Sequence, residues 1–463
     1  MSDTQPSGRI LVVGAGYVGL TTAACLAHLG HDVICADIDQ AKVASLSAGV
    51  VPIREADLDR LVAEGIARRR LRFVTSAEAV AAACEFVFVC VPTPLRADGE
   101  TELGYLFAAL ESVASRLRPG SVVVTKSTVP VGTSPKIAAA LGRTDVALAS
   151  NPEFLREGSA VADFLAPDRI VIGAEDGAAT RRVAALYANV EAPMILCDPT
   201  SAETVKYAAN AFLAAKVSFV NALAAVCEAV DADVDTVLAG VGTDHRIGTA
   251  YLQPGPGWGG SCLPKDTRAL VSVANDAGYV FDLLEGVIAV NEQQLDRVVA
   301  KVAGMAAGRN SDLAAERADG RSSDVADALH SVGLDGVTVA LLGLTFKAGT
   351  DDLRGSPALR IAELLRTRGA RLAAYDPAMR SLEDRPDIAS QLPADMELRS
   401  SAYGALQGAD VAVVLTEWPE FAALDWKRAA SEMATARVVD ARNLLDARQL
   451  RSAGFVYEGL GRR

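Results

Sequence analysis

The stretch RILVVGAGYVGLTTAACLAHLGHDVICADID, residues 9–39, decides the fold of this chain. A β-branched run at 9–13 leads directly into GAGYVG at 14–19, and a pattern of small and apolar residues typical of a helix follows. Strand, tight turn and helix in this order are what a dinucleotide-binding unit requires. Its first glycine allows the turn, the second lets a pyrophosphate approach, and the third lets the helix lie against the strand. The sequence predicts these roles for Gly14, Gly16 and Gly19.

A second strand pattern, HDVICADID, ends near Asp37, about 20 residues beyond the last glycine. A carboxylate at this place can hold the ribose hydroxyls of a dinucleotide and disfavours a 2′-phosphate. We therefore predict NAD rather than NADP as the cofactor. The alternative is a glycine turn with a purely structural role, which a lone GxGxxG would not exclude.

Further buried strands are predicted within EFVFVCVPTP, residues 85–94, and SVVVTKSTVP, residues 121–130. Thr93 and Thr128 then lie near strand carboxyl ends, where open α/β sheets bind ligands, unless they only terminate the strands. The next segment carries Glu153 and Glu157 in NPEFLREG. These acids could transfer protons, or they could form a solvated helix start.

The segment 199–230 is alanine-rich, has apolar residues on most faces and predicts a long, largely buried helix. Lys206 and Asn210 stand four residues apart and share one face of it. Polar groups are costly to bury unless they bind something, so this pair could stabilise an oxyanion. The alternative is a lysine whose ammonium reaches the surface.

The sequence PGPGWGGSCLPKD, residues 254–266, places Cys262 in a glycine-rich turn before a predicted helix. A thiolate is stabilised at a helix N-terminus beside a lysine, here Lys265, so Cys262 is a candidate nucleophile. The alternative is a buried structural cysteine.

The second half repeats the α/β pattern after a polar segment at 304–335 that reads as a linker or insertion. A strand, turn and helix begin near residue 337, and a strand ending on Asp376 echoes the one ending on Asp37. GxGxxG is missing there, so we do not expect a dinucleotide to bind in the same way. Lys347 and Arg442 follow predicted strands and could bind a nucleotide diphosphate.

The predicted fold class is α/β, with two doubly wound Rossmann-like domains joined by a long central helix. We expect a nucleotide-binding domain at 1–198, a central helical and dimerisation domain at 199–303, the linker at 304–335, and a second α/β domain at 336–463.

Composition argues against several classes of partner. The 463 residues are half hydrophobic and carry a net charge of −13, which does not favour a nucleic acid or an anionic membrane. Seven cysteines without a CxxC pair fit a reduced, cytoplasmic chain without a metal site. We see no run long and apolar enough for a membrane span, and the polar start MSDTQPSG does not read as a signal peptide.

The ordered motifs GAGYVG, VPTP, KSTVPVG, NPEFLREG, KYAANAF, RIG, GWGGSCLPKD and FKAGTDDLRGSP resemble those of the UDP-glucose and GDP-mannose (nucleotide-sugar) 6-dehydrogenase family over nearly the whole chain. The resemblance implies an NAD-dependent, four-electron oxidation of a sugar C6 alcohol to a carboxylate. The aldehyde would be captured by the cysteine as a thiohemiacetal, oxidised to a thioester and hydrolysed. TEW at 416–418 resembles the branch of the family that oxidises UDP-glucose to UDP-glucuronate.

The resemblance also implies roles for individual residues. The implied catalytic residues are Cys262 as nucleophile, Lys206 and Asn210 as oxyanion stabilisers, Asp266 with Thr128 as the pair that orders a water, and Glu157 as an acid that assists hydrolysis. The implied NAD contacts are Gly14, Gly16, Tyr17, Val18, Gly19, Asp37, Lys42, Thr93, Thr128, Glu157, Lys265 and Arg354. The implied substrate contacts are Glu153, Phe154, Leu155, Arg156, Glu157, Lys206, Asn210, Arg246 from a neighbouring subunit, Tyr251, Leu252, Gln253, Pro254, Gly255, Gly259, Lys347 and Arg442.

Other functions remain open at this point. The same chemistry could act on dTDP-glucose, a UDP-N-acetylhexosamine or GDP-mannose. A non-catalytic sensor of NAD or a nucleotide sugar could keep the fold, and a two-electron dehydrogenase of the 6-phosphogluconate type would share the first nucleotide site without needing the cysteine. A long apolar helix and an arginine acting between subunits favour a homodimer or a higher homo-oligomer.

Overall fold

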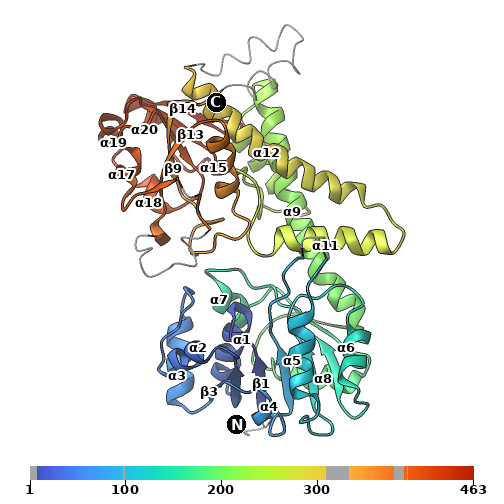
Figure 1. Ribbon diagram of the computed structural model, residues 1–463. Coiled ribbons are helices and arrows are strands. Elements are labelled where there is room, and N and C mark those ends of the chain that lie inside the picture. Colours follow the sequence, from blue (N-terminus) through green and yellow to red (C-terminus); the bar gives the residue numbers. More distant parts are fainter. Residues whose placement is uncertain (1–7, 97–99, 309–332, 380–390, 394, 463) are drawn as a thin grey trace. The chain divides into compact units, whose positions relative to one another are not determined.

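The computed structural model describes residues 8–96, 100–308, 333–379, 391–393 and 395–462 (Figure 1). The chain divides into two compact units. The N-terminal unit comprises Met1–Ala209 and Arg268–Tyr279, and the C-terminal unit comprises Asn210–Thr267 and Val280–Arg463. Most of the predicted linker at 304–335 lies outside the described residues.

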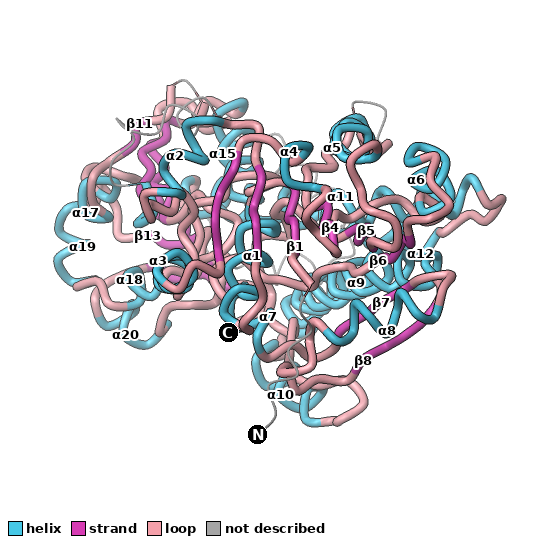
Figure 2. The backbone as a smooth tube through the Cα atoms, turned by 90° about the horizontal axis from the view of Figure 1, so that it is seen from below, coloured by secondary structure: helices cyan, strands magenta, loops and turns pink. Residues whose placement is uncertain are grey.

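The N-terminal unit is built on an eight-stranded sheet with the order β3-β2-β1-β4-β5-β6-β7-β8 (Figure 2). Neighbouring strands are parallel except for β6 and β7, which pair antiparallel. The strands are β1 (Ile10–Val13), β2 (Val33–Ala36), β3 (Leu71–Val74), β4 (Phe86–Val89), β5 (Val122–Thr125), β6 (Ala147–Ser150), β7 (Ile170–Gly173) and β8 (Met194–Cys197). The order of the first six is that of a dinucleotide-binding fold, whose ligand crevice lies where β1 and β4 diverge.

Helices cover both faces of this sheet. They are α1 (Tyr17–His28), α2 (Gln40–Ser47), α3 (Leu58–Ala67), α4 (Glu78–Ala81), α5 (Gly104–Ala114), α6 (Ser134–Leu141), α7 (Ala160–Leu165) and α8 (Gly177–Ala185). Ile10 and Val12 of β1 lie in one core with α1 and α3, whereas Leu11 and Val13 lie in another with α5 and α6. Because successive strand residues face opposite sides, a strand buried on both faces is a continuous apolar run.

The C-terminal unit contains six parallel strands in the order β11-β10-β9-β12-β13-β14. They are β9 (Thr338–Leu342), β10 (Arg371–Tyr375), β11 (Glu397–Leu398), β12 (Val411–Val414), β13 (Arg437–Asp440) and β14 (Val456–Gly459). Counted from β9, this is the same order as in the first six strands of the other unit. The prediction of two doubly wound domains is therefore confirmed.

Helices also flank the second sheet. They are α15 (Pro357–Thr367), the short η1 (Pro377–Met379), α17 (Ala402–Leu406), α18 (Pro419–Ala422), α19 (Trp426–Glu432) and α20 (Ala447–Ser452). Leu295, Val298 and Val302 of α12 (Asp282–Ala306) share a core with Val339 and Leu341 of β9. Helix α12 thus closes one face of this sheet together with α15.

The turns after β1 and β9 share a backbone frame. The Gly14 N–H donates to Ala36 O at 2.7 Å, and the Gly343 N–H donates to Tyr375 O at 2.8 Å. The carboxylates one residue further along, Asp37 and Asp376, both accept from the amide that follows the glycine, each at 2.8 Å. The similar sequence patterns that end on Asp37 and Asp376 therefore reflect the same turn in both units.

The two carboxylates differ in their surroundings. Asp376 is fully buried, and it also accepts from the Thr345 hydroxyl at 3.1 Å and the Trp418 indole N–H at 3.2 Å. Thr345 takes the place of Gly16, so the carboxylate of the second turn is engaged by the protein itself.

Among the described residues, four helices lie between the two sheets in the chain: α9 (Pro199–Val230), α10 (Val234–Thr243), α11 (Leu263–Asp276) and α12. The prediction that α9 is largely buried is wrong, because Phe212 and Phe219 are 68% and 61% exposed. Apolar residues on most faces of a helix do not reveal which face the rest of the protein covers.

Helix α9 is also long and apolar enough to cross a membrane by length and composition alone, contrary to the expectation from the sequence. Core helices of soluble proteins pass the same test. Glu203 of α9 is buried and accepts hydrogen bonds from the backbone N–H groups of Gly132 and Ser134 at the start of α6. Buried polar groups bonded to protein are typical of a helix that packs against other protein segments.

Candidate active site

The turn between β1 and α1 requires its glycines. A Cβ on Gly14, whose φ is +100°, would lie 2.5 Å from Cys90 O, and a Cβ on Gly19 would lie 1.9 Å from Gly14 O. Gly16 instead faces open space, with nothing within 4 Å of a Cβ placed there, and no side chain in the described part of the chain caps it. The space beside Gly16 at the N-terminus of α1 is thus open, as binding of a pyrophosphate to the first helical turn would require.

Asp37 lies at the end of β2 with a half-buried lysine beside it. Its carboxylate accepts from the Ala15 N–H at 2.8 Å and from Lys42 Nζ at 3.2 Å. Burial favours the neutral acid, but the Asp39 and Ala15 amides and the Lys42 ammonium outweigh it, so the pKa of Asp37 lies below its ordinary value. An ionised acceptor suits ribose hydroxyls, and Ile38, 93% exposed, offers an apolar surface next to it.

Two predicted residues meet at the ends of β4 and β5. The Thr93 hydroxyl donates to Thr128 O at 2.7 Å, and Ser127 Oγ donates to Val91 O at 2.8 Å. These bonds join the loops after neighbouring strands beside the turn that follows β1. Both threonines therefore lie in the loops that follow β4 and β5, at the sheet edge where this fold binds its ligand.

Glu55 contacts two segments that carry predicted site residues, and the sequence does not single it out. It is buried and contacts the Tyr17 hydroxyl, and it accepts from the N–H groups of Gly158 and Ala160 at 2.7 and 2.9 Å. Glu55 thus links the turn after β1 to the segment that carries Glu157. Its sequence context, an acid shortly before a helix, is unremarkable.

Lys206 and Glu153 form a buried ion pair, with Nζ and Oε1 2.8 Å apart and side chains only 4% and 6% exposed. The alternative that the Lys206 ammonium reaches the surface is therefore wrong. Burial raises the pKa of Glu153, but the attraction and hydrogen bond of Lys206 and the Leu155 amide outweigh it and hold this pKa below its ordinary value.

Asn210 lies one turn further along α9. Its Nδ2 donates to Asp266 Oδ2 at 2.6 Å, and Lys265 Nζ lies 2.5 Å from Asp266 Oδ1. Asp266 is fully buried. Three residues that the resemblance singled out therefore form one connected polar group, which α9 and the first turn of α11 supply.

Cys262 directly precedes α11 and is only partly buried, whereas Cys25, Cys35, Cys84, Cys90 and Cys227 are buried. Burial raises the pKa of the Cys25 and Cys90 thiols to about 12, which makes them inert. Ser261 Oγ lies 3.6 Å from the Cys262 sulfur. Access and position at a helix N-terminus suit a nucleophile better than a structural role.

The glycine-rich loop before Cys262 lies against the turn that follows β9. A Cβ on Gly259 would lie 2.1 Å from Gly355 O, and one on Gly260 would lie 2.9 Å from the Phe346 ring. A Cβ on Gly255 would lie 3.3 Å from Arg442 Nη1. The C-terminal unit thus gathers the predicted loop at 251–255 and Arg442 in one place.

Arg442 donates to the carbonyls of Leu415 and Phe346, each at 2.9 Å. Lys347 lies 5.7 Å above the Phe346 ring. Two cations therefore flank Phe346 at the carboxyl ends of the strands, where a diphosphate is expected to bind.

All four predicted arginines have a carboxylate as partner, and Arg442 pairs with Glu417 at 3.1 Å. The other three form closer ion pairs. Arg156 pairs with Asp163, Arg246 with Asp244, and Arg354 with Asp352, each at 2.6 Å. All three side chains are largely exposed. Thr128 belongs to the N-terminal unit and Asp266 to the C-terminal unit, so the predicted water-ordering pair stays a prediction.

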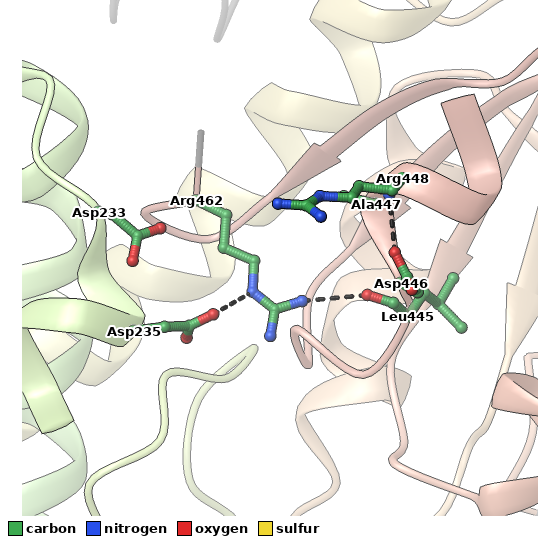
Figure 3. Close-up of a pocket in the computed structure, with 7 residues that line it drawn as sticks. All are labelled: Asp233, Asp235, Leu445, Asp446, Ala447, Arg448 and Arg462. Carbon is green, nitrogen blue, oxygen red and sulfur yellow. Dashed lines mark hydrogen bonds and ion pairs between the residues drawn. The ribbon is translucent and has the colours of Figure 1, made fainter. Parts of the chain in front are cut away.

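Two hollows lie away from the predicted residues. One, of about 470 Å³, is lined by Asp233, Asp235, Leu445, Asp446, Ala447, Arg448 and Arg462 (Figure 3). In it, Arg462 joins Asp235 at 2.6 Å to Leu445 O at 3.1 Å, which ties α10 to the end of the second sheet. The other, of about 460 Å³, lies in the N-terminal unit beside α5 and α11.

Comparison with known proteins identifies the domains. Models of the UDP-glucose/GDP-mannose dehydrogenase family match residues 8–191 as the NAD-binding domain, 200–293 as the central domain and 340–447 as the UDP-binding domain. The UDP-glucose 6-dehydrogenase of Rhizobium meliloti is 42% identical, with 98% of this chain and 99% of that protein covered. UDP-glucose 6-dehydrogenase TuaD of Bacillus subtilis is 38% identical, with 98% and 93% covered.

Solved structures agree with this result. A UDP-glucose dehydrogenase from the archaeon Pyrobaculum islandicum has a TM-score of 0.86 at 35% identity, with both chains fully covered. A UDP-D-ManNAc dehydrogenase from Pyrococcus horikoshii has a TM-score of 0.81 at 28% identity, with 98% and 99% covered. The chain belongs to the UDP-glucose/GDP-mannose dehydrogenase family and is an NAD-dependent nucleotide-sugar dehydrogenase.

Proposed function

We propose that this protein oxidises the C6 hydroxyl of UDP-glucose to the carboxylate of UDP-glucuronate in a four-electron reaction, through a thioester on Cys262. The observation that carries the proposal is the partly buried thiol at the start of α11, one turn from the buried Asp266 and its partner Asn210. The names of relatives that are 42% and 38% identical over the chain support UDP-glucose as the substrate.

NAD, when bound, accepts a hydride in each of the two oxidations. The chain's own residues then have separate tasks. The Cys262 thiolate adds to the C6 aldehyde, which keeps this reactive group covalently bound between the two oxidations. Lys206 and a second N–H of Asn210 stabilise the negative charge on the C6 oxygen. Glu153 holds the Lys206 ammonium in place at 2.8 Å.

Hydrolysis requires a water beside the thioester. Asp266, Thr128 and Glu157 are proposed to bind this water and to take up its proton. Attack of the water oxygen on the carbonyl carbon breaks the C–S bond and returns the thiol of Cys262. Asn210 and Lys265 each contact one carboxylate oxygen of Asp266, and these contacts support a fixed orientation of the proposed base.

The remaining predicted residues are assigned to binding. We propose that Gly14, Gly16, Tyr17, Val18, Gly19, Asp37, Lys42, Thr93, Lys265 and Arg354 contact NAD. We propose that Phe154, Leu155, Arg156, Arg246, Tyr251, Leu252, Gln253, Pro254, Gly255, Gly259, Lys347 and Arg442 contact the nucleotide sugar. The convergence of the loop at 251–255 with Arg442 supports the second assignment.

The domain boundaries 1–198, 199–303, 304–335 and 336–463 stay proposals, supported by the ranges of the three family models.

We also propose a cytoplasmic homodimer. Phe212, Phe219 and Val226 are exposed and spaced seven residues apart, so they lie on one face of α9 and would be covered by a second copy. Light scattering of Phe219→Glu tests this: the variant should be a monomer, and an unchanged dimer would move the interface elsewhere.

A substrate panel tests the choice of sugar. UDP-glucose, dTDP-glucose, UDP-N-acetylglucosamine and GDP-mannose are supplied separately with NAD, and the product masses are measured. Of these four substrates, UDP-glucose should have the highest kcat/KM, with UDP-glucuronate as its product. The likeness to a UDP-D-ManNAc dehydrogenase makes an aminosugar the second candidate, and a preference for UDP-N-acetylglucosamine would favour it.

A further inference from the structure

The main chain of the glycine-rich loop before Cys262 is held by side-chain amides. The Gly255 N–H donates to Asn221 Oδ1 at 2.8 Å, and Gly255 O accepts from Gln294 Nε2 at 2.7 Å. The Trp258 N–H donates to Asn291 Oδ1 at 2.8 Å, and Trp258 O accepts from Asn291 Nδ2 at 3.1 Å. Both polar backbone groups of two loop residues are thus bound by side chains from α9 and α12.

These three amide side chains are buried, with exposed fractions of 1% for Asn221, 7% for Asn291 and 2% for Gln294. Burying an amide costs free energy unless its hydrogen bonds are made. Asn291 and Gln294 are three residues apart on α12 and therefore share one face, which they turn toward the loop. Apolar side chains would leave the buried backbone groups of Gly255 and Trp258 without these partners, so the amides favour one position of the loop.

The shape of the loop depends on the same contacts. Gly257 has a φ of +129°, and a Cβ there would lie 3.0 Å from Asn291 Oδ1. The Trp258 indole N–H donates to Ser218 Oγ at 2.8 Å. Glycine is favoured here because its φ lies in a region that other residues rarely adopt and because a side chain would crowd Asn291.

We propose that Asn221, Asn291 and Gln294 are positioning residues for the glycine-rich loop before Cys262 and for Cys262 itself. We call these three residues the amide clamp. The clamp forms hydrogen bonds with Gly255 and Trp258. Gly255 is the last of the proposed substrate contacts at 251–255, and Trp258 lies between these contacts and Cys262. It acts on affinity for the nucleotide sugar and on the reactivity of the thiol, and it leaves NAD affinity unchanged. The first of these effects rests on the proposed function.

Gln294→Met tests the clamp against a matched control. Methionine has a similar volume but no donor, so Gly255 O loses its partner, whereas Gln293→Met changes an exposed residue of the same helix. A buried carbonyl left unpaired weakens binding through the displaced loop, and we expect the KM for UDP-glucose to rise roughly tenfold. The KM for NAD should not change, and Gln293→Met should match the parent protein in both constants.

A second pair of variants separates the loss of the hydrogen bond from a general folding defect. Asn221 Oδ1 accepts from Gly255, while its Nδ2 has no partner among the described residues. Asn221→Asp keeps the acceptor and should keep the parent KM, even where burying a charge lowers the melting temperature. Asn221→Leu removes the acceptor and should raise the KM. Equal KM values for these two variants would overturn the proposal.

A readout without substrate separates this inference from the proposed function. Iodoacetamide alkylation of the folded proteins is followed by peptide mass spectrometry, with Cys197, the other partly exposed cysteine, as the internal reference. Cys262 in Gln294→Met should react several-fold faster or slower than in Gln293→Met, relative to Cys197. If the parent protein does not oxidise UDP-glucose, the proposed function fails and this test still stands. Unchanged Cys262 reactivity in folded Gln294→Met would refute the clamp.

Discussion

Asn210 Nδ2 lies 2.6 Å from Asp266 Oδ2, and this bond joins the central helix α9 to the first turn of the helix that Cys262 precedes. Asp266 is fully buried, and its other oxygen lies 2.5 Å from Lys265 Nζ. Because its oxygens are held from two sides, the carboxylate cannot rotate without breaking one of these bonds. The orientation of the acid one turn after Cys262 is therefore set by side chains of α9 and α11.

Asp266→Asn should slow hydrolysis of the thioester. The substitution keeps the shape of the side chain but removes the base, and loss of a general base typically costs about 10²–10⁴-fold in rate. Rapid mixing should show a burst of NADH followed by a slow steady state. A steady-state rate equal to that of the parent enzyme would remove Asp266 from the hydrolytic step.

Cys262→Ser should reduce turnover of UDP-glucose to near zero, because a serine hydroxyl at neutral pH is a far weaker nucleophile than a thiolate. Turnover is followed as NADH absorbance, with NAD binding by titration as the control for folding. Cys197→Ser is the matched variant and should be fully active. Full activity of Cys262→Ser would eliminate covalent capture.

Asp37→Ala should weaken NAD binding without changing the affinity for UDP-glucose. The substitution removes the ionised acceptor for the ribose hydroxyls and leaves Lys42 without its partner at 3.2 Å. Loss of hydrogen bonds to a charged group typically costs about 1.5–3 kcal/mol, or roughly 10–100-fold in Kd. Calorimetric titration measures both ligands, and an unchanged Kd for NAD would place the ribose elsewhere.

We expect the ionisation of Lys126 to increase the free energy of unfolding as the pH rises above 8. Its Nζ is buried at the end of β5 and donates to Asn151 Oδ1 at 3.1 Å. Burial lowers the pKa of Lys126 from 10.5 to about 8, although Cys90 and Glu153 favour the charged form and Lys206 opposes it. Between these two values the unfolded chain binds the extra proton, so the free energy of unfolding rises with pH.

Urea unfolding of the parent protein and Lys126→Met at pH 7.5 and 9.5 measures this effect. We expect the difference between the two pH values to be more positive for the parent protein than for the variant. Equal pH dependence in both proteins would mean that Lys126 titrates at its ordinary value.

Much of the fold could be predicted from the sequence because the deciding signals are local. The run at 9–13 is buried on both faces of a parallel sheet, and the glycines after it prevent steric overlaps within the same turn. Both features leave a pattern in neighbouring residues. The repeat of this turn after β9 was predictable for the same reason.

What the sequence did not reveal depends on contacts between distant residues. Glu55 bonds to Gly158, and Gln294 bonds to Gly255, across 103 and 39 residues of chain. Neither residue has a local pattern that sets it apart from a surface acid or a surface amide. The exposed face of α9 was missed because an alanine-rich helix with apolar residues all round does not show which side is covered.

The four-electron chemistry is tested most directly by counting NADH. UDP-glucose is supplied in a limiting amount with excess NAD, and the reaction is followed to completion by absorbance. Two NADH per UDP-glucose, with UDP-glucuronate as the product, is the result expected from capture of the aldehyde on Cys262. One NADH per sugar, with free aldehyde in solution, would contradict it.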